Sequence, residues 1–287
     1  MNEFPNKRSK SILTQNEIIA LYLEGYSTSE IGSFSNVSAR YIRSILNKNQ
    51  VEMRPIGSWK RKFKVNENYF KTWSNNMAYI LGFFMADGCM VQDQQTISFA
   101  QKEKYILMQI KDVIESTHPI IQNPITGVYI LNIHSKIMKT DLMKLHGVTS
   151  KKSKELIFPI IPEEYMSHFI RGYFDGDGYV NYKSYFVSIV GGSIEFMKSL
   201  QNKIEVHGFT TNFTTHENHY RVYVSGRKTI KNFSEWLYKD KELFLERKYE
   251  EFNKEKEDVS ILRDKIKMHN NAKKARSDRG SNNLKNN

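Results

Sequence analysis

The feature that most constrains this sequence is a pair of similar apolar segments that each end in an acid and a glycine. The first segment reads ILGFFMADG (residues 80–88) and the second reads IRGYFDGDG (residues 170–178). Asp177 follows Asp87 by 90 positions, and the segments that come after the two motifs keep this spacing. The chain therefore contains a long internal repeat, and a fold built from two related halves is expected.

Each repeat unit predicts the order helix, two strands, helix, two strands, helix, because helical and alternating apolar patterns follow one another in that order. We predict an α+β fold with two pseudo-symmetric αββαββα half-domains, each holding an antiparallel four-stranded sheet. After the motif helices, the expected strands are 89–92, 96–100, 120–124 and 127–134 in the first half, and 179–184, 185–190, 209–216 and 219–226 in the second. The expected later helices are 102–116 and 138–147, then 193–208 and 231–240.

Small residues in the two motifs predict that the motif helices cross each other closely. Gly82 and Gly172 each lie four residues before another small residue, Ala86 or Gly176, and such spacing lets two backbones approach. Asp87 and Asp177 would then lie side by side at two helix C-termini, where the partial negative charge of each helix adds to their repulsion.

A pair of acids in that position predicts a site for Mg²⁺ or Mn²⁺, since these hard cations take carboxylates, waters and phosphate oxygens as ligands. The alternative is that each Asp only ends a helix before a glycine turn. That alternative explains one motif well, but the occurrence of two motifs at matching places in a repeat favours the metal site.

The charge of the chain predicts a polyanionic partner. There are 43 Lys and Arg residues against 31 Asp and Glu residues, a net charge of +12 at pH 7. Such an excess favours nucleic-acid binding through phosphate neutralisation. The single cysteine, Cys89, excludes an internal disulfide and a CxxC zinc site. We expect no membrane association, because no apolar run approaches the length needed to span a bilayer and no secretory signal is present.

The N-terminal region predicts a helix-turn-helix domain over residues 1–49. Thr14 with Glu17 has capping-box spacing, Gly25 can end the first helix, and Ser38 can cap the third. The alternative is a small helical cap with a basic face. If the domain binds double-stranded DNA, the residues expected to contact it lie on the third helix: Arg40, Tyr41, Arg43 and Lys48.

Composition sets the remaining boundaries. Residues 50–71 are polar and basic and are predicted to be a linker. The two half-domains are expected over residues 72–160 and 161–253. Residues 254–287 are predicted to be a disordered basic tail, because this segment is polar and ends in the low-complexity run KKARSDRGSNNLKNN.

The paired motifs resemble those of single-chain LAGLIDADG homing endonucleases, and the repeat resembles the αββαββα half-domain of that family over about residues 75–254. The stretches HGVTSKKSKELIFPIIPEEYMSHFIRGYFDGDG and LFLERKYEEF also look like this family, particularly its intein-borne and phage-borne members. The resemblance implies a DNA-binding saddle and a site-specific endonuclease that makes double-strand breaks at a long target. The single cysteine fits a reducing cytosol, so we expect a cytoplasmic protein, and the likeness to phage-borne members points to a bacterial or phage-infected cell.

The resemblance further implies which residues carry the chemistry. Asp87 and Asp177 would bind the catalytic metal, whereas Met85 and Asp175 stand at a motif position that does not hold it. The family places a polar residue on the second strand and a lysine after the fourth, which match Gln101 and Lys136 in the first half. In the second half they match Gly191 and either Arg227 or Lys228.

Two points stay open at these positions. Gly191 departs from the pattern because it has no side chain to order a water molecule, so the two half-sites are expected to be unequal. Lys136 and Lys228 have the alternative interpretation of ordinary surface charge.

The resemblance also implies that the strands of both sheets lie in the major groove. The residues expected to face DNA in the first half are Gln92, Gln94, Thr96 and Ser98, and in the second half Asn181, Lys183, Tyr185, Val187 and Arg227. Because the halves differ in sequence, the target should be asymmetric. Because one chain supplies both acids, a monomer is expected. The competing functions are a DNA-binding regulator that does not cleave and an RNA maturase on the same scaffold.

Overall fold

The computed structural model describes residues 11–54, 63–91, 94–149 and 152–263. Contacts along the chain divide it into two compact units, Met1–Phe63 and Lys64–Asn287. Among the described residues, no helix is long and apolar enough to cross a membrane.

The smaller unit is a bundle of three short helices, α1 (Gln15–Leu23), α2 (Thr28–Phe34) and α3 (Ala39–Lys48). Its helix starts are well specified, because Thr14 with Glu17 and Ser27 with Glu30 each form a complete capping box. Ser38 caps α3 by accepting a hydrogen bond from the main-chain N–H of Tyr41. The apolar residues of the three helices form a separate core: Ile18, Tyr22, Ile31, Ile42, Ile45 and Leu46.

The larger unit contains two four-stranded antiparallel sheets of the same topology. The first sheet has the order β1-β2-β4-β3 and the second has the order β5-β6-β8-β7. The strands of the first are β1 (Gly88–Met90), β2 (Thr96–Gln101), β3 (Ile120–Gln122) and β4 (Tyr129–His134); those of the second are β5 (Gly178–Asn181), β6 (Phe186–Gly191), β7 (Thr211–Thr215) and β8 (Tyr220–Ser225). The predicted α+β fold of two pseudo-symmetric halves is confirmed.

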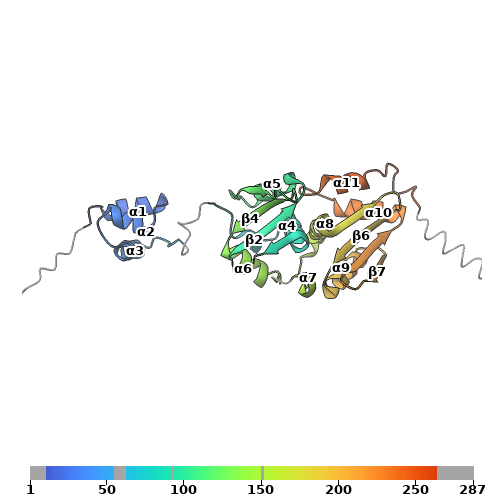
Figure 1. Ribbon diagram of the computed structural model, residues 1–287, viewed down its shortest axis with the longest axis horizontal. Coiled ribbons are helices and arrows are strands. Elements are labelled where there is room, and N and C mark those ends of the chain that lie inside the picture. The colour runs from blue at the N-terminus through green and yellow to red at the C-terminus, as the bar shows by residue number, and fades with distance from the viewer. Residues whose placement is uncertain (1–10, 55–62, 92–93, 150–151, 264–287) are drawn as a thin grey trace, which may run out of the picture. The chain divides into compact units, whose positions relative to one another are not determined.

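Helices occur at matching places in the two halves. The motif helices are α4 (Asn75–Asp87) and α8 (Met166–Asp177), and Figure 1 shows them at the centre of the larger unit with one sheet on either side. The other helices are α5 (Lys104–Val113) and α6 (Lys136–Lys144) in the first half, α9 (Ile194–Val206), α10 (Arg227–Leu237) and α11 (Glu246–Phe252) in the second, and the short elements η2 (Tyr69–Lys71), α7 (Lys152–Glu155) and η3 (Glu163–Tyr165).

The motif helices pack against each other along their length, and glycine makes their close approach possible. A β-carbon at Gly82 would lie 2.1 Å from the carbonyl oxygen of Phe169, and one at Gly172 would lie 2.0 Å from that of Tyr79. Any larger residue at either position would clash with the partner backbone. The sequence therefore specifies this crossing point through its two glycines.

Each sheet packs one face on the helices and leaves the other face without a helix among the described residues. In the first sheet Ile97 and Phe99 are fully buried against the helices, while Ser98 pairs with Cys89 and Asn132 across the opposite face. In the second sheet Val187 and Ile189 are buried against the helices, and Ser188, which is also buried, pairs with Tyr179 and Tyr223 on the opposite face. This period-two alternation defines the open face of each sheet.

The expected tail differs from the structure over its first residues. Glu255 is 4% exposed and Leu262 is 3% exposed, so these two residues pack on the protein. This packing could not be predicted from composition, because Glu255 is buried through an ion pair with Arg227. Residues 264–287 lie outside the described residues.

Candidate active site

Asp87 and Asp177 are the last residues of the two motif helices, and the helix crossing brings their ends together. A β-carbon at Gly176, the neighbour of Asp177, would lie 3.4 Å from the carboxyl carbon of Asp87. The charges of both acids also affect the pKa of the same buried phenol, the side chain of Tyr173. The pKa of Tyr173 is raised well above its ordinary value by burial first, and then by the negative charges of Asp177 and Asp87. The two acids therefore share one small region, as the motif spacing predicted.

Gln101 lies beside Asp87, in the place that the resemblance implied. It is the last residue of β2, and its side-chain amide donates a 3.1 Å hydrogen bond to the Asp87 carboxylate. Its amide oxygen accepts a 2.8 Å hydrogen bond from the main-chain N–H of Lys102, which fixes the orientation of the amide. The first half-site thus pairs a carboxylate with a fixed polar group.

The matching position of the second half, Gly191, is closed to a side chain. A β-carbon there would lie 2.6 Å from the sulfur of Met197 and 2.7 Å from the hydroxyl oxygen of Tyr173. The two half-sites are therefore built from different residues.

The structure does not bring Lys136 and Lys228 to the acids. Lys136 follows His134, which pairs with Thr96 at the opposite end of β2 from Gln101. In the second half, Ser225 pairs with Phe186, the first residue of β6, whereas Gly178 pairs with Ile189 near the other end. Since a six-residue strand is about 17 Å long, both lysines lie at the far end of their sheets. The fourth strand of each half runs away from the acids, which the motif comparison did not show.

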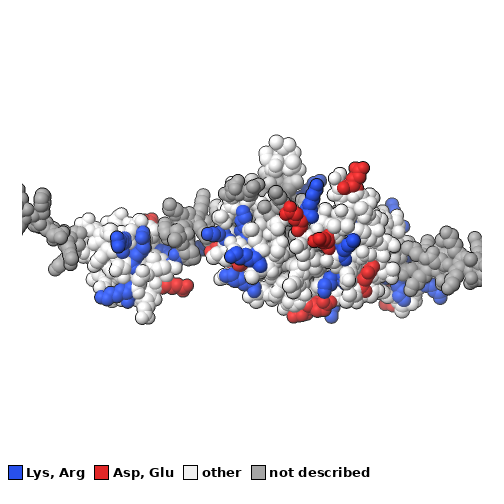
Figure 2. Space-filling view, turned by 90° about the horizontal axis from the view of Figure 1, so that it is seen from below, with Lys and Arg blue, Asp and Glu red and all other residues white. Residues whose placement is uncertain are grey.

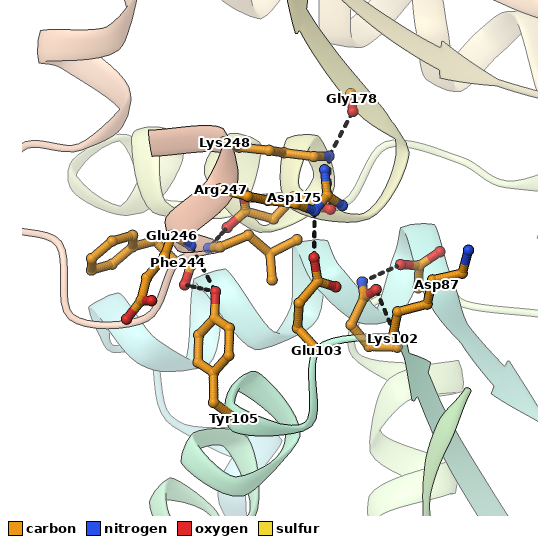
Figure 3. A network of polar contacts seen from close by, with 12 residues as sticks. Asp87, Lys102, Glu103, Tyr105, Asp175, Gly178, Phe244, Glu246, Arg247 and Lys248 are labelled. Carbon is orange, nitrogen blue, oxygen red and sulfur yellow. Dashed lines mark hydrogen bonds and ion pairs between the residues drawn. The ribbon is translucent and has the colours of Figure 1, made fainter. Parts of the chain in front are cut away.

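Another lysine lies at the end of the second motif helix. Lys248, on α11, is 4% exposed, and its ammonium donates to the carbonyl oxygens of Phe174 (2.6 Å), Asp175 (2.8 Å) and Gly178 (2.6 Å). These carbonyls surround Asp177 in the chain, and Figure 3 shows the ammonium directed at Gly178. A cation is favourable at a helix C-terminus because the last carbonyls carry partial negative charge.

The negative charges of both motif acids also affect the pKa of the Lys248 ammonium. Burial lowers the pKa of its ammonium to about 8, and the carboxylates of Asp175, Asp87 and Asp177 oppose that shift. The stretch LFLERKYEEF looked family-like in the sequence, but no role was predicted for this lysine. The signal that could have found it is a lysine flanked by Leu245 and Phe252 in a short amphipathic helix, since a lysine there needs a buried partner.

Asp175 holds the segment that carries Lys248. Its carboxylate is fully buried and accepts hydrogen bonds from the Tyr79 hydroxyl (2.8 Å) and from the main-chain N–H of Leu245 (2.8 Å). Burial raises the pKa of this carboxyl to about 6, although Lys248 and the Leu245 N–H oppose the rise. Asp175, which was expected not to hold metal, therefore helps to position Lys248.

Residues 243–248, hereafter the C-terminal segment, also contact the first half. Arg247 forms an ion pair with Glu103, and the Tyr105 hydroxyl accepts a 2.6 Å hydrogen bond from the main-chain N–H of Glu246. Figure 3 shows these contacts beside Asp87 and Lys102. The segment thus joins both halves next to the acids.

The donor set at the helix ends suits a divalent cation. Two carboxylates lie close together with the Gln101 amide next to one of them. Within the described residues there is no group of three or more His, Cys, Asp and Glu side chains that could hold a metal ion. Mg²⁺ commonly binds through one or two carboxylates together with waters and substrate phosphates, so a pair of acids is a sufficient protein contribution.

The expected DNA-facing residues of the first sheet are only partly exposed. Gln94 is exposed in the turn before β2, and Ser98 is half-buried on the open face. Thr96 lies on the same face but is buried, and its hydroxyl makes a 2.8 Å hydrogen bond with His134. The exposed member of this pair is His134. Gln92 lies outside the described residues.

The second-half set needs correction, because a turn interrupts the expected alternation. β5 ends at Asn181 and β6 begins at Phe186, so Lys183 and Tyr185 lie in the turn, where Tyr185 has a φ of 51°. Lys183 is exposed, Asn181 and Tyr185 are half-buried, and Val187 is fully buried in the core.

Arg227 is also engaged within the protein. Its guanidinium donates two hydrogen bonds to Glu255, of 2.6 and 2.9 Å, and lies 3.2 Å from Glu257. The open face presents Tyr179, Asn181 and Tyr223, so the expected face of β5 was right at Asn181. The error of one residue lies in β6, where Ser188 and not Val187 is on this face, and Ser188 is itself buried.

The third helix of the smaller unit presents the expected residues to solvent. Arg40, Tyr41, Arg43 and Lys48 are all exposed, on the side of α3 opposite Ile42, Ile45 and Leu46. Figure 2 shows several basic side chains on the visible face of this unit.

Comparisons with known proteins give a family match. Residues 74–120 and 164–237 match the family model of the LAGLIDADG-like domain. Similar segments occur in a probable translation initiation factor IF-2 of Methanocaldococcus jannaschii (30% identical over 97 residues) and in a reverse gyrase of the same organism (33% identical over 116 residues). They cover 30% and 40% of this chain but only 8% and 6% of those proteins, so the chain corresponds to a small part of each.

Solved structures with similar folds include homing endonucleases and a protein of another kind. Full-length DUF199/WhiA from Thermatoga maritima has 16% identity and a TM-score of 0.46, with 76% of this chain and 72% of that chain covered. The homing endonuclease I-WcaI bound to its DNA recognition sequence has 15% identity and a TM-score of 0.44, with 71% and 96% covered. Both likenesses are distant.

Proposed function

The chain contains a LAGLIDADG-like domain, and on that basis we propose that it is a site-specific DNA endonuclease that makes metal-dependent double-strand breaks. One observation carries this proposal: the glycine-mediated crossing of α4 and α8 brings Asp87 and Asp177 to one place. Two aspartates with a purely structural role would not need to converge, and like charges at two helix ends oppose folding unless cations lie between them.

The proposed roles follow from the contacts. Asp87 and Asp177 hold Mg²⁺ or Mn²⁺, which would lower the pKa of a bound water and stabilise charge on the scissile phosphates. Gln101 orients water next to Asp87 through its fixed amide. Lys248 supplies positive charge for the phosphate as negative charge develops during cleavage.

We assign DNA contacts to the open faces of the two sheets and to α3. The residues on the first face are Ser98, Asn132 and His134, and those on the second are Tyr179, Asn181 and Tyr223. Since the two faces differ, the target is asymmetric. Arg40, Tyr41, Arg43 and Lys48 would lengthen the footprint by contacting bases and phosphates. Both acids come from one chain, so the active form is a monomer.

The experiment that tests the proposal is cleavage of a DNA library of random sequences and genomic fragments with Mg²⁺. The wild type is compared with Asp87→Asn and Asp177→Asn, which keep the side-chain shape and remove the charge. We expect site-specific double-strand cuts that require the metal and are lost in both variants. Cutting that survives both substitutions would refute the assignment of the site.

The second candidate function is DNA binding without cleavage, and Gly191 is the observation that favours it. The second half-site has no side chain where the first has Gln101, as in a site that has lost its chemistry. Specific DNA binding without any cut, unchanged in both Asp variants, would support a regulator. Preferential binding of a folded intron RNA over the DNA would support the RNA maturase.

A further inference from the structure

The second half-site holds a buried hydroxyl where the first holds an amide. Tyr173 is the counterpart of Phe83, since the two residues follow Gly172 and Gly82 in the two motifs. Tyr173 is 2% exposed, and its hydroxyl oxygen lies where a β-carbon at position 191 would come within 2.7 Å. In the first half the situation is reversed, because Phe83 has no hydroxyl and Gln101 reaches Asp87. Each half therefore has one polar group at this place, from the strand in one case and from the motif helix in the other.

The Tyr173 hydroxyl has hydrogen-bonding capacity to spare. It donates a 3.2 Å hydrogen bond to the carbonyl oxygen of Val190, which uses its one proton. A hydroxyl also has two acceptor lone pairs, so it can still accept a hydrogen bond from water. Burial and the two motif acids hold the pKa of this phenol well above its ordinary value, so the group stays neutral and keeps its proton.

Tyr173 and Asp177 line the same cavity. It has a volume of about 110 Å³ and is lined by Tyr173, Asp177, Ser193 and Gly192, with apolar residues behind them. Gly192 lines this cavity without a side chain, whereas the first half has Lys102 at the matching position. A cavity of this size with several polar groups on its wall has room for ordered water.

We propose that Tyr173 is the positioning residue of the second half-site and that its hydroxyl orders water at Asp177, as the Gln101 amide does at Asp87. This inference rests on the proposed endonuclease function. It removes the apparent defect at Gly191, because glycine is the residue that leaves room for the phenol. The two strands of the target are then cut by half-sites that order water with different groups.

The main test measures each strand of the target separately. The target recovered from the library is labelled on one strand or the other, and nicking rates are measured with Mg²⁺. Tyr173→Phe removes only the hydroxyl and is expected to slow cleavage of one strand by about tenfold or more, the loss expected for one hydrogen bond to a reacting water. Gln101→Gly is expected to slow the opposite strand. The control is Tyr238→Phe, which removes another buried phenol hydroxyl, and it should leave both rates unchanged.

A second readout does not depend on cleavage. Mn²⁺ binding to the full chain without DNA is measured by electron paramagnetic resonance titration. The wild type and Tyr173→Phe should bind the same number of ions, because Tyr173 acts through water and not as a ligand. Loss of an ion in Tyr173→Phe would overturn the water-ordering role.

The outcomes separate the two proposals. If Tyr173→Phe nicks each strand at the same rate as the wild type does, the role of Tyr173 is overturned and the endonuclease function is left intact. Equal slowing of both strands would also overturn it, because that result indicates a general structural effect. A wild type that cuts no DNA would refute the endonuclease function, and it would also refute the role of Tyr173, which depends on that function.

Discussion

The ammonium of Lys248 lies 2.6 Å from the carbonyl oxygen of Gly178, the residue that follows Asp177. Lys248 comes 70 positions after Gly178 in the chain, so this contact depends on the fold and not on local sequence. The same ammonium also bonds the carbonyls of Phe174 and Asp175. A single buried cation thus ends the second motif helix and stands beside the acids that the proposed chemistry requires.

Replacing this cation should reduce cleavage without removing DNA binding. Lys248→Met keeps the aliphatic stem and removes the charge, and we expect a loss of about a hundredfold in cleavage rate, typical of a group that stabilises transition-state charge. Lys136→Met and Lys228→Met are the matched controls, since both lysines lie at the far ends of their sheets. They should change the rate by less than about threefold. The reverse order of effects would show that the lysines after the fourth strands, and not Lys248, serve the site.

Substitution of the crossing glycines should destabilise the larger unit. A β-carbon at Gly172 would lie 2.0 Å from the carbonyl oxygen of Tyr79, which is backbone and cannot move aside. We expect Gly172→Ala and Gly82→Ala each to lower the free energy of unfolding by about 1–3 kcal/mol or more, the cost of overpacking. Urea denaturation followed by tryptophan fluorescence measures it. A change smaller than about 0.5 kcal/mol would contradict the close crossing.

Asp175 should control the docking of the C-terminal segment. Its carboxylate accepts the Leu245 N–H and lies near Lys248 and Arg171. Asp175→Asn leaves these buried cations without their counter-charge, so we expect a loss of about 3 kcal/mol in stability. The specific readout is hydrogen exchange at the Leu245 amide, which should become faster than in the wild type. Asp112→Asn, on an exposed surface of α5, provides the control.

The Arg227–Glu255 pair should make stability depend on acid pH. The hydrogen bonds from Arg227 lower the pKa of the Glu255 carboxyl from 4.5 to about 2. A lowered folded-state pKa contributes stability that is present above pH 4.5 and is lost as the pH falls towards 2. Glu255→Gln removes this contribution, so its stability deficit against the wild type should shrink over that range. A deficit that stays constant from about pH 5 to about pH 2.5 would exclude the pair as its cause.

The exposed face of α3 should contribute to DNA affinity through phosphates. Arg40→Ala and Arg43→Ala are expected to weaken binding of the target and to reduce the slope of log affinity against log salt by about one for each phosphate that is no longer neutralised. Lys198→Ala, on α9 of the larger unit, is the control because α9 packs on the covered face of its sheet. Fluorescence anisotropy at several salt concentrations measures both quantities. An unchanged salt slope in the Arg variants would remove α3 from the interface.

The repeat, the sheets and the paired acids could be predicted from the sequence because they depend on local patterns. Glycine spacing, apolar periodicity and capping residues are all readable within one helix or strand, and β2 and β6 keep the 90-position offset of the motifs. Gln101 was predicted from the family resemblance, and the structure places it at the end of β2 beside Asp87.

What the sequence missed depends on long-range contacts. Lys248 reaches the site from 70 positions beyond Gly178, and its role is visible only once Asp175 is seen to hold Leu245. The turn at residues 182–185 shifted the expected strand alternation, because Tyr185 adopts a φ of 51° that the aromatic pattern did not indicate. Burial of Glu255 required Arg227, a partner 28 positions away.

The position of the C-terminal segment also sets an order of assembly. Its contacts with Glu103 and Tyr105 in the first half and with Asp175 and Gly178 in the second are complete only when both halves and the segment itself have been synthesised. During synthesis this segment leaves the ribosome after both motifs. Nascent chains therefore carry the two acids before they carry the buried lysine, and the protein gains its proposed cutting capacity at a late step of its own maturation.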